Sequence, residues 1–224
     1  MRNLIFASVC LLSSALLGCQ QQPPANDQLD AVLWTQTSIE HELLYRQVFA
    51  NATRQLDIAL ATPNWDALPL PPRDLAGLPP AVIVDIDETV LDNVPLHARD
   101  IRTNQVYSYD RWNTWVDQAK AQALPGAVEF LQAADQKGIT VYYISNREHS
   151  QVQATVNNLR LRGFPVERNE QVLAASTPTG HCEQAGYGKN CRRQWVANHA
   201  RVLMLAGDSF GDFVQAEHNT LADQ

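Results

Sequence analysis

Apolar and polar positions along the chain predict a helical N-terminal region followed by alternating strands and helices. Apolar residues recur at helical spacing across Leu29–Leu60, and no proline falls between Asp30 and Ala61. One long helix or two consecutive helices are therefore expected there. Repeated prolines at 62–80 exclude both helix and central strand, so this stretch is expected to be a connector.

Beyond residue 80, short apolar runs alternate with helical periodicity. Val82, Ile83 and Val84 are typical of a strand buried on both faces. Strands are predicted at 81–87, 139–145, 171–175 and 201–208, and helices at 109–122, 125–137, 149–162 and 191–199. This alternation indicates right-handed crossovers, and so an α/β fold with a doubly wound parallel sheet and helices on both faces.

Polar side chains follow these predicted strands. The first strand carries Asp85 and Asp87 with Thr89 close behind, the second leads into Ser145, and the last leads into Asp208 and Asp212. The carboxyl ends of parallel strands share one edge of the sheet, so these groups are expected to converge there. A lone Asp208 would fit a helix cap equally well, but paired acids after a doubly buried strand do not.

Converging carboxylates need a cation. Two carboxylates about 4 Å apart repel by roughly 1 kcal/mol in water and by several times more in a partly dry cleft. Hard oxygen ligands without histidine or cysteine favour Mg²⁺ over zinc. The pattern therefore predicts a magnesium site.

Composition narrows the class of protein. The chain has 224 residues, of which 45% are hydrophobic, enough for one sizeable domain with a genuine core. Its formal net charge is −7 and it has no long basic run. Sequence-independent binding to a nucleic acid polymer requires a positive surface, so that class is excluded.

The N-terminus has the features of an export signal. Residues 1–18 combine Arg2, a short apolar run and small residues near the end, and the run is shorter than a membrane span needs. Ending at Gly18-Cys19, it resembles a bacterial lipoprotein signal, in which Cys19 is acylated; a plain signal peptide is the alternative. Residues 19–28 would be a polar tether, and 29–224 a single domain.

Export affects how the remaining cysteines are interpreted. Cys182 and Cys191 lie nine positions apart in a loop-like stretch, and an exported protein can be oxidised. A disulfide closing this loop would contribute roughly 2–3 kcal/mol. A partial metal site is the alternative, but no Cys-x-x-Cys motif or histidine pair accompanies these residues.

Six segments follow one another along the chain from about Leu33 to Phe213: "LWTQTSIEHELLYRQVF", "DIDETVLDN", "RWNTWVDQAKAQALPGAVEFL", "YYISNR", "GKNCRRQ" and "GDSFGDF". In this order they resemble the haloacid dehalogenase-like superfamily, and more narrowly its class C bacterial acid phosphatases, a lipoprotein 5′-nucleotidase-like group. This resemblance implies the haloacid dehalogenase-like fold, with an N-terminal helical extension and a small cap insert at about 94–123.

The resemblance assigns roles residue by residue. Asp85 matches the nucleophile that forms an aspartyl-phosphate, and Asp87 the general acid and base. The resemblance implies the following further roles: Mg²⁺ held by Asp85, the backbone carbonyl of Asp87, and Asp208; support for these ligands from Asp212 and Thr89; and phosphate binding by Ser145, Asn146 and Lys189.

Lys189 and Trp112 each have two possible interpretations. Lys189 either binds phosphate or is a solvated loop lysine. Trp112 either stacks on the base of a nucleotide or packs inside the cap. Trp115 is expected in the core. Arg192 and Arg193 are expected at a solvated helix start; the alternative is that one of them assists Lys189. His97 and His149, which lie near the motifs, are expected at the surface.

The hypothesis is a Mg²⁺-dependent phosphomonoesterase of the bacterial cell envelope, in the periplasm or at the outer membrane, with an acid optimum. Its substrates would be nucleoside monophosphates or small organic phosphates, and Cys19 would attach it to the membrane. A phosphotransferase and a non-catalytic binding lipoprotein are the alternatives. Relatives usually continue a few dozen residues past the last motif, so an uncovered sheet edge, with oligomerisation or reduced stability, is expected.

Overall fold

The computed structural model describes residues 26, 28–70, 73–180 and 188–215. The predicted signal peptide, Cys19 and Cys182 lie outside these residues, so acylation and the disulfide remain predictions. No helix within the described ranges is long and apolar enough to cross a membrane.

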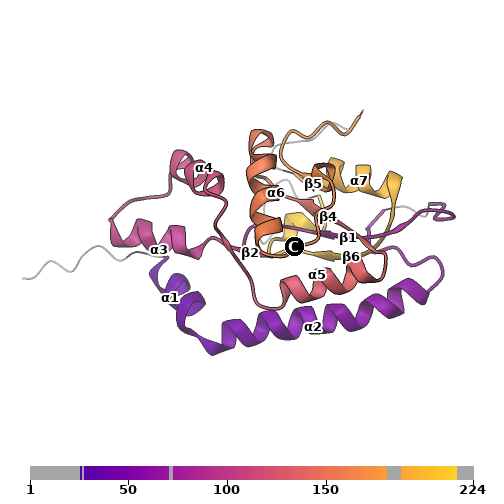
Figure 1. The fold of residues 1–224 in the computed structure, drawn as a ribbon, viewed down its shortest axis with the longest axis horizontal. Helices are drawn as coiled ribbons and strands as arrows, with labels where there is room; N and C mark the ends of the chain where they lie inside the picture. The colour runs from indigo at the N-terminus through magenta and orange to yellow at the C-terminus, as the bar shows by residue number, and fades with distance from the viewer. Residues whose placement is uncertain (1–25, 27, 71–72, 181–187, 216–224) are drawn as a thin grey trace, which may run out of the picture.

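A parallel sheet forms the centre of the described chain (Figure 1). Its strand order is β5-β4-β1-β6, where β1 is Pro80–Val84, β4 Thr140–Ile144, β5 Val172–Leu173 and β6 Arg201–Ala206. Val82 pairs with Val141 on one side and Met204 on the other. β1 is flanked by strands and buried on both faces, and Asp85 at its carboxyl end is buried too.

All four predicted strands are confirmed, but their predicted ends extended too far. The first strand ends at Val84 rather than at residue 87. The chain turns there: the amide of Leu91 donates to the Ile86 carbonyl, and Glu88 has a φ of 57°. Asp85 and Asp87 therefore lie in a tight loop directly after the strand.

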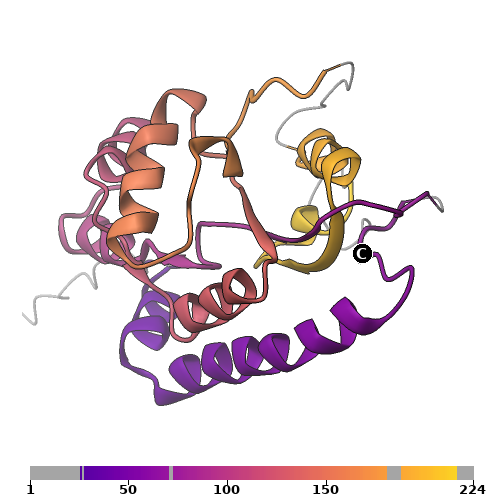
Figure 2. The same ribbon diagram turned by 45° about the vertical axis from the view of Figure 1, so that its right-hand side comes forward.

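Helices cover both faces of the sheet, as predicted. On one face α2 (Ile39–Ala61), α5 (Ala127–Gln136) and α6 (Val152–Leu161) pack against Val82 and Val84, and on the other α7 (Asn190–His199) packs against Ala81 and Ile83. Figures 1 and 2 both show α2 running alongside α5.

The N-terminal region forms two helices, α1 (Leu29–Thr37) and α2, which are separated at Ser38. The Ser38 hydroxyl caps α2 by accepting from the His41 amide at 3.0 Å. The apolar spacing in this region is only partly explained by burial. Phe49 and Leu56 are buried in the core, whereas Leu44 and Val48 are exposed.

The region predicted as a cap insert contains two helices, α3 (Val94–Arg102) and α4 (Tyr109–Asp117). An antiparallel pair, β2 (Leu91–Asp92) and β3 (Gln122–Ala123), holds the two ends of the insert together. The predicted helix at 109–122 ends at Asp117, because the backbone at Ala119 is left-handed, with a φ of 51°. Helix α3 and the β2–β3 pair were not predicted.

Candidate active site

The loop after β1 is tied to the N-terminal helical region. The Tyr45 hydroxyl, from α2, donates to the Glu88 carbonyl at 2.6 Å. At the other end of the loop, the backbone N–H of Asn93 donates to the Glu88 carboxylate at 2.9 Å. These contacts hold Glu88 in its left-handed conformation, and the flanking Asp87 and Thr89 are positioned with it.

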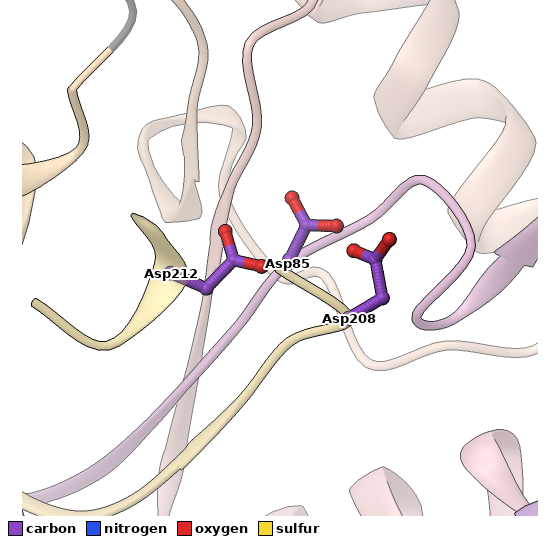
Figure 3. Close-up of side chains that lie close together, drawn as sticks. All are labelled: Asp85, Asp208 and Asp212. Atoms are coloured by element: carbon purple, nitrogen blue, oxygen red, sulfur yellow. The ribbon is translucent and has the colours of Figure 1, made fainter. Parts of the chain in front are cut away.

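Three carboxylates converge at the sheet edge. Asp85, Asp208 and Asp212 each offer an oxygen, and these atoms lie within 4.8 Å of one another. Figure 3 shows the three side chains turned toward a shared space. The Thr89 hydroxyl lies between two of them, 3.2 Å from an Asp85 oxygen and 3.3 Å from an Asp208 oxygen.

Lys189 is the cation of this cluster. Its ammonium group donates to Asp85 and lies 2.6 Å from an Asp212 oxygen. Its side chain is buried, which excludes the alternative of a solvated loop lysine. With all groups ionised, three carboxylates and one ammonium leave two negative charges uncompensated.

Burial perturbs the ionisation of the cluster. It raises the pKa of Asp85 to about 7, with Lys189 opposing the rise and Asp212 and Asp87 adding to it. Burial and the Asp212 charge also raise the pKa of Asp208. Although burial lowers the pKa of Lys189, the charges of Asp85 and Asp212 outweigh that effect and raise it overall. A cation bound among these carboxylates would oppose the rises.

The donor set fits a hard divalent cation. The cluster offers carboxylate oxygens with a hydroxyl beside them. One divalent cation would neutralise its two uncompensated negative charges. Asp208 is exposed while Asp85 and Asp212 are buried, so an ion can enter from the Asp208 side.

Asp212 reaches the cluster because residue 207 is a glycine. A Cβ placed at Gly207 would lie 2.4 Å from the Asp212 Cβ, closer than atoms can approach. The Asp212 carboxylate also accepts from the Ser209 amide at 3.0 Å. Arg193 donates to the carbonyls of Gly211 and Asp212, which holds the turn from the other side.

Asp87 lies in a separate network. Its carboxylate accepts from two nitrogens of Arg147, with an Nη2–Oδ1 distance of 2.7 Å and an Nε–Oδ1 distance of 3.0 Å. The Ser145 hydroxyl donates to it at 3.1 Å and the Asn93 side-chain amide at 2.9 Å. Arg147 is 2% exposed, so this ion pair is shielded from water on the arginine side.

The predicted phosphate-binding residues follow β4. Ser145 is buried beside Asp87, while Asn146 is exposed and its side-chain oxygen accepts from Arg192 at 2.7 Å. Lys189 reaches the same edge from the start of α7. The structure therefore brings all three to the site, although Lys189 contacts the acids on the Asp85 side.

The expectation that Arg192 and Arg193 are solvated is wrong. Both side chains are buried: Arg192 lies against the carboxyl ends of β4 and β5, and Arg193 lies against the turn after β6. Arg192 donates to the carbonyls of Ser145 and Leu173 and so fixes the ends of both strands.

The two cap tryptophans differ. Trp115 is buried, as predicted, and its indole N–H donates to the Asn93 side-chain oxygen at 2.8 Å. Trp112 is half-buried and packs against the core, so a stacking role remains a prediction. His149 is exposed, as expected, whereas His97 is half-buried.

A mostly apolar cavity of about 430 Å³ adjoins the acidic cluster. It lies between α2 and β6, with Leu44 and Val48 on one side and Met204 on the other, and it reaches Thr89 and Asp208. The sequence pattern did not predict this cavity, because its lining comes from α2 and β6, which lie far apart along the chain.

Sequence reasoning missed the roles of Arg147, Asn93 and Arg192. Of the three, Arg147 was the easiest to identify from the sequence. It belongs to "SNR", directly after a predicted strand whose carboxyl end faces the acids. Arg192 gave no such signal because its partners lie far away along the chain, and Asn93 gave none because the orientation of its amide depends on Trp115 in the cap.

This fold, with acids after β1 and β6, a hydroxyl after β4 and a buried lysine from α7, is that of the haloacid dehalogenase-like proteins. The chain belongs to the HAD superfamily, subfamily IIIB (acid phosphatase), whose family model matches residues 19–222. The resemblance inferred from the motifs is confirmed.

Solved structures give the same result. The class C acid phosphatase from Bacillus anthracis with tungstate bound is 35% identical, with a TM-score of 0.74 over 88% of this chain and 74% of that chain. A second structure of the Bacillus anthracis enzyme is 36% identical, with a TM-score of 0.70 over 84% of this chain and 71% of that one.

Curated relatives are more distant. Acid phosphatase 1 of Solanum lycopersicum is 26% identical over 132 residues, and the stem 31 kDa glycoprotein of Glycine max is 24% identical over 136 residues. Each alignment covers 59% of this chain, and the chain spans about half the length, 51%, of either relative.

Proposed function

We propose that this protein is a Mg²⁺-dependent phosphomonoesterase that works through an aspartyl-phosphate. The observation that carries the proposal is that the two aspartates after β1 lie in different surroundings. Asp85 lies beside Lys189 and the acidic cluster, while Asp87 faces Arg147 and Ser145. Membership of an acid phosphatase subfamily supports the same activity.

The chemistry needs two displacements. An Asp85 oxygen attacks phosphorus, the bond from phosphorus to the ester oxygen breaks, and Asp87 gives a proton to the departing alcohol. Water then attacks the phosphorus of the aspartyl-phosphate, the bond from phosphorus to the Asp85 oxygen breaks, and the attacking water gives a proton to Asp87. Inorganic phosphate leaves, and both aspartates return to their starting states.

Charge is the main obstacle to the first displacement, because an anionic carboxylate must approach an anionic phosphate. Lys189 offsets part of this charge at Asp85. Asp85, Asp208 and the Asp87 carbonyl would hold Mg²⁺, with Asp212 and Thr89 supporting them. When bound, this ion supplies charge neutralisation at the phosphate oxygens.

The substrate class we propose is nucleoside monophosphates or small organic phosphates. Trp112 is half-buried at the cap and is the candidate for stacking on a base. Ser145 and Asn146 lie at the carboxyl end of β4, where phosphate oxygens would be bound.

We also propose an envelope location, with Cys19 acylated, the tether at 19–28 and a Cys182–Cys191 disulfide. The sequence of residues 1–19 supports this proposal. Strand β6 stands at the edge of the described sheet, which supports association of two copies as a further proposal.

The test is phosphate release from a nucleoside monophosphate and an aryl phosphate between pH 4 and 8, with Mg²⁺ or with EDTA. We expect release from both substrates with Mg²⁺, a loss with EDTA, and recovery when Mg²⁺ is added back. Product analysis with added glycerol separates transfer from hydrolysis. Absence of release under all conditions would contradict the proposal and favour a binding protein.

A further inference from the structure

The environment of Asn93 is unusual for a residue at the base of a cap. The side chain is fully buried, at 0% exposure, and all of its polar atoms have partners. Its oxygen accepts from the Trp115 indole at 2.8 Å, and its side-chain nitrogen donates to Asp87 at 2.9 Å and to Glu88 at 3.3 Å.

These partners fix which way the amide faces. An indole N–H can only donate, so it must face the amide oxygen of Asn93. Asp87 is ion-paired with Arg147, so its carboxylate oxygen accepts and must face the amide nitrogen. Reversing the amide would lose the contacts with both Trp115 and Asp87. Trp115 therefore ensures that a donor, rather than an acceptor, points at Asp87.

The Asn93 side chain also adds a second donor residue, besides Arg147, to Asp87 Oδ1. Asp87 Oδ1 accepts from Arg147 and Asn93, while Oδ2 accepts from Ser145 and, at a longer 3.2 Å, from Arg147. Asn93 approaches from the cap side, whereas Arg147 approaches from the loop after β4. Together they leave the carboxylate little freedom to rotate.

We propose that Asn93, oriented by Trp115, is a positioning residue that holds Asp87 at the angle needed for proton transfer. The inference rests on the proposed function, in which Asp87 gives its proton to the leaving alcohol. It adds a link between helix α4 of the cap, which carries Trp115, and the proton-transfer residue of the core.

The readout is the dependence of kcat/KM on the leaving group. An alkyl phosphate has a poor leaving group and needs the proton from Asp87, whereas 4-nitrophenyl phosphate has a good one and needs it far less. General acid catalysis contributes about 10²- to 10⁴-fold. For Asn93→Ala we expect kcat/KM to fall about 10- to 100-fold on the alkyl phosphate but less than about 5-fold on the aryl phosphate.

The chain supplies a matched control. Asn158 is also a buried asparagine, at 1% exposure. Its side-chain oxygen accepts from the Ala121 N–H at 3.1 Å, and its side-chain nitrogen donates to the Ala121 carbonyl at 2.9 Å. It has no contact with Asp87 among the bonds of the described residues. Asn158→Ala should lower the melting temperature while leaving the ratio of the two kcat/KM values unchanged.

A second variant removes the orienting donor alone. Trp115→Phe keeps an aromatic side chain in the core but removes the indole N–H, so the Asn93 amide can reverse. We expect the same selective loss on the alkyl phosphate, smaller than for Asn93→Ala. This variant also decides the matter if Asn93→Ala does not fold.

Combining variants gives the final check. In an Asp87→Asn background, adding Asn93→Ala should leave the leaving-group ratio where Asp87→Asn has already put it. An equal loss on both substrates in Asn93→Ala and Trp115→Phe would overturn the inference while leaving the proposed function intact. A wild-type protein that releases no phosphate would instead contradict the proposed function itself.

Discussion

Asp85 and Asp87 leave the same strand two residues apart, yet they enter opposite electrostatic settings. Asp85 shares one lysine with Asp212 and lies against further carboxylates, so negative charge is in excess there. Asp87 instead meets a buried arginine, with the hydroxyl of Ser145 and an amide beside it. The two halves of the site have different charge balances.

The difference indicates why the same residue type can serve two roles. The Asp85 side can attract a divalent cation because its charge is not balanced by protein groups. The Asp87 side is balanced by Arg147 and has no such need. A second cation beside Asp87 would meet the guanidinium group and be repelled.

The largest expected effect comes from Asp85→Asn. An amide cannot act as the nucleophile, so kcat should fall by at least about 10³-fold. No aspartyl-phosphate should be detected by mass spectrometry after rapid quenching. Circular dichroism should be unchanged, because the amide retains the shape of the carboxyl group. Near-normal turnover would contradict the assignment of Asp85.

Asp87→Asn should have a smaller and different effect. We expect kcat/KM on an alkyl phosphate to fall about 10²- to 10⁴-fold, because the proton donor is lost. With an aryl phosphate the aspartyl-phosphate should still form, and it should accumulate because the base for its hydrolysis is absent. The comparison with Asp85→Asn is sharpest here, since only one of the two variants should carry the phosphoryl group. Failure to trap any phosphoprotein would contradict this separation of roles.

The two cations of the site provide the next test. Lys189→Met removes the positive charge beside Asp85, so Mg²⁺ should bind more tightly in isothermal titration calorimetry while kcat falls about 10²-fold. Arg147→Met removes a contact of Asp87 and should leave Mg²⁺ affinity within about 2-fold. Equal changes in Mg²⁺ affinity for both variants would mean that the two halves of the site are not electrically separate.

The smallest effect concerns stability without metal. Burial raises the pKa of Asp85 from 3.8 to about 7 and, together with the Asp87 charge, that of Glu88 from 4.5 to about 8. The folded state then holds protons that the unfolded state has released, so stability falls as pH rises from about 4 to about 8.

Calorimetric melting temperatures check this sign. With EDTA the melting temperature should fall by several degrees between pH 5 and 8, and Mg²⁺ should raise it more at pH 8 than at pH 5. Asp85→Asn should flatten the dependence in EDTA. A metal-free protein that becomes more stable toward pH 8 would contradict the argument.

Much of the fold followed from the sequence because the sheet is built from runs such as Val82–Val84 that are apolar on both faces. The convergence of Asp85, Asp208 and Ser145 followed from the rule that parallel strands share their carboxyl ends. The cap was harder to predict: Val94, Leu96 and Asp100 are buried on α3, and this short helix shows no long apolar period.

The counterion of Asp87 could not be assigned for a different reason. The resemblance pointed to Lys189, but Arg147 is one cation among many, and the sequence does not say which acid it faces. Arg192 looked like a solvated residue at a helix start, but α7 lies against the sheet edge and buries it. Such pairings depend on where whole elements dock, which periodicity does not encode.

Gly207 has a consequence for the range of sequences that can carry this site. The space its missing Cβ leaves is filled by the Asp212 side chain, whereas Gly211 has nothing within 4 Å of the equivalent point. In a library that randomises both positions and selects for activity, position 207 should return glycine alone and position 211 a mixture of residues. The two glycines of "GDSFGD" are the same residue type, but only position 207 is restricted to glycine by its surroundings, so it carries more sequence information than position 211.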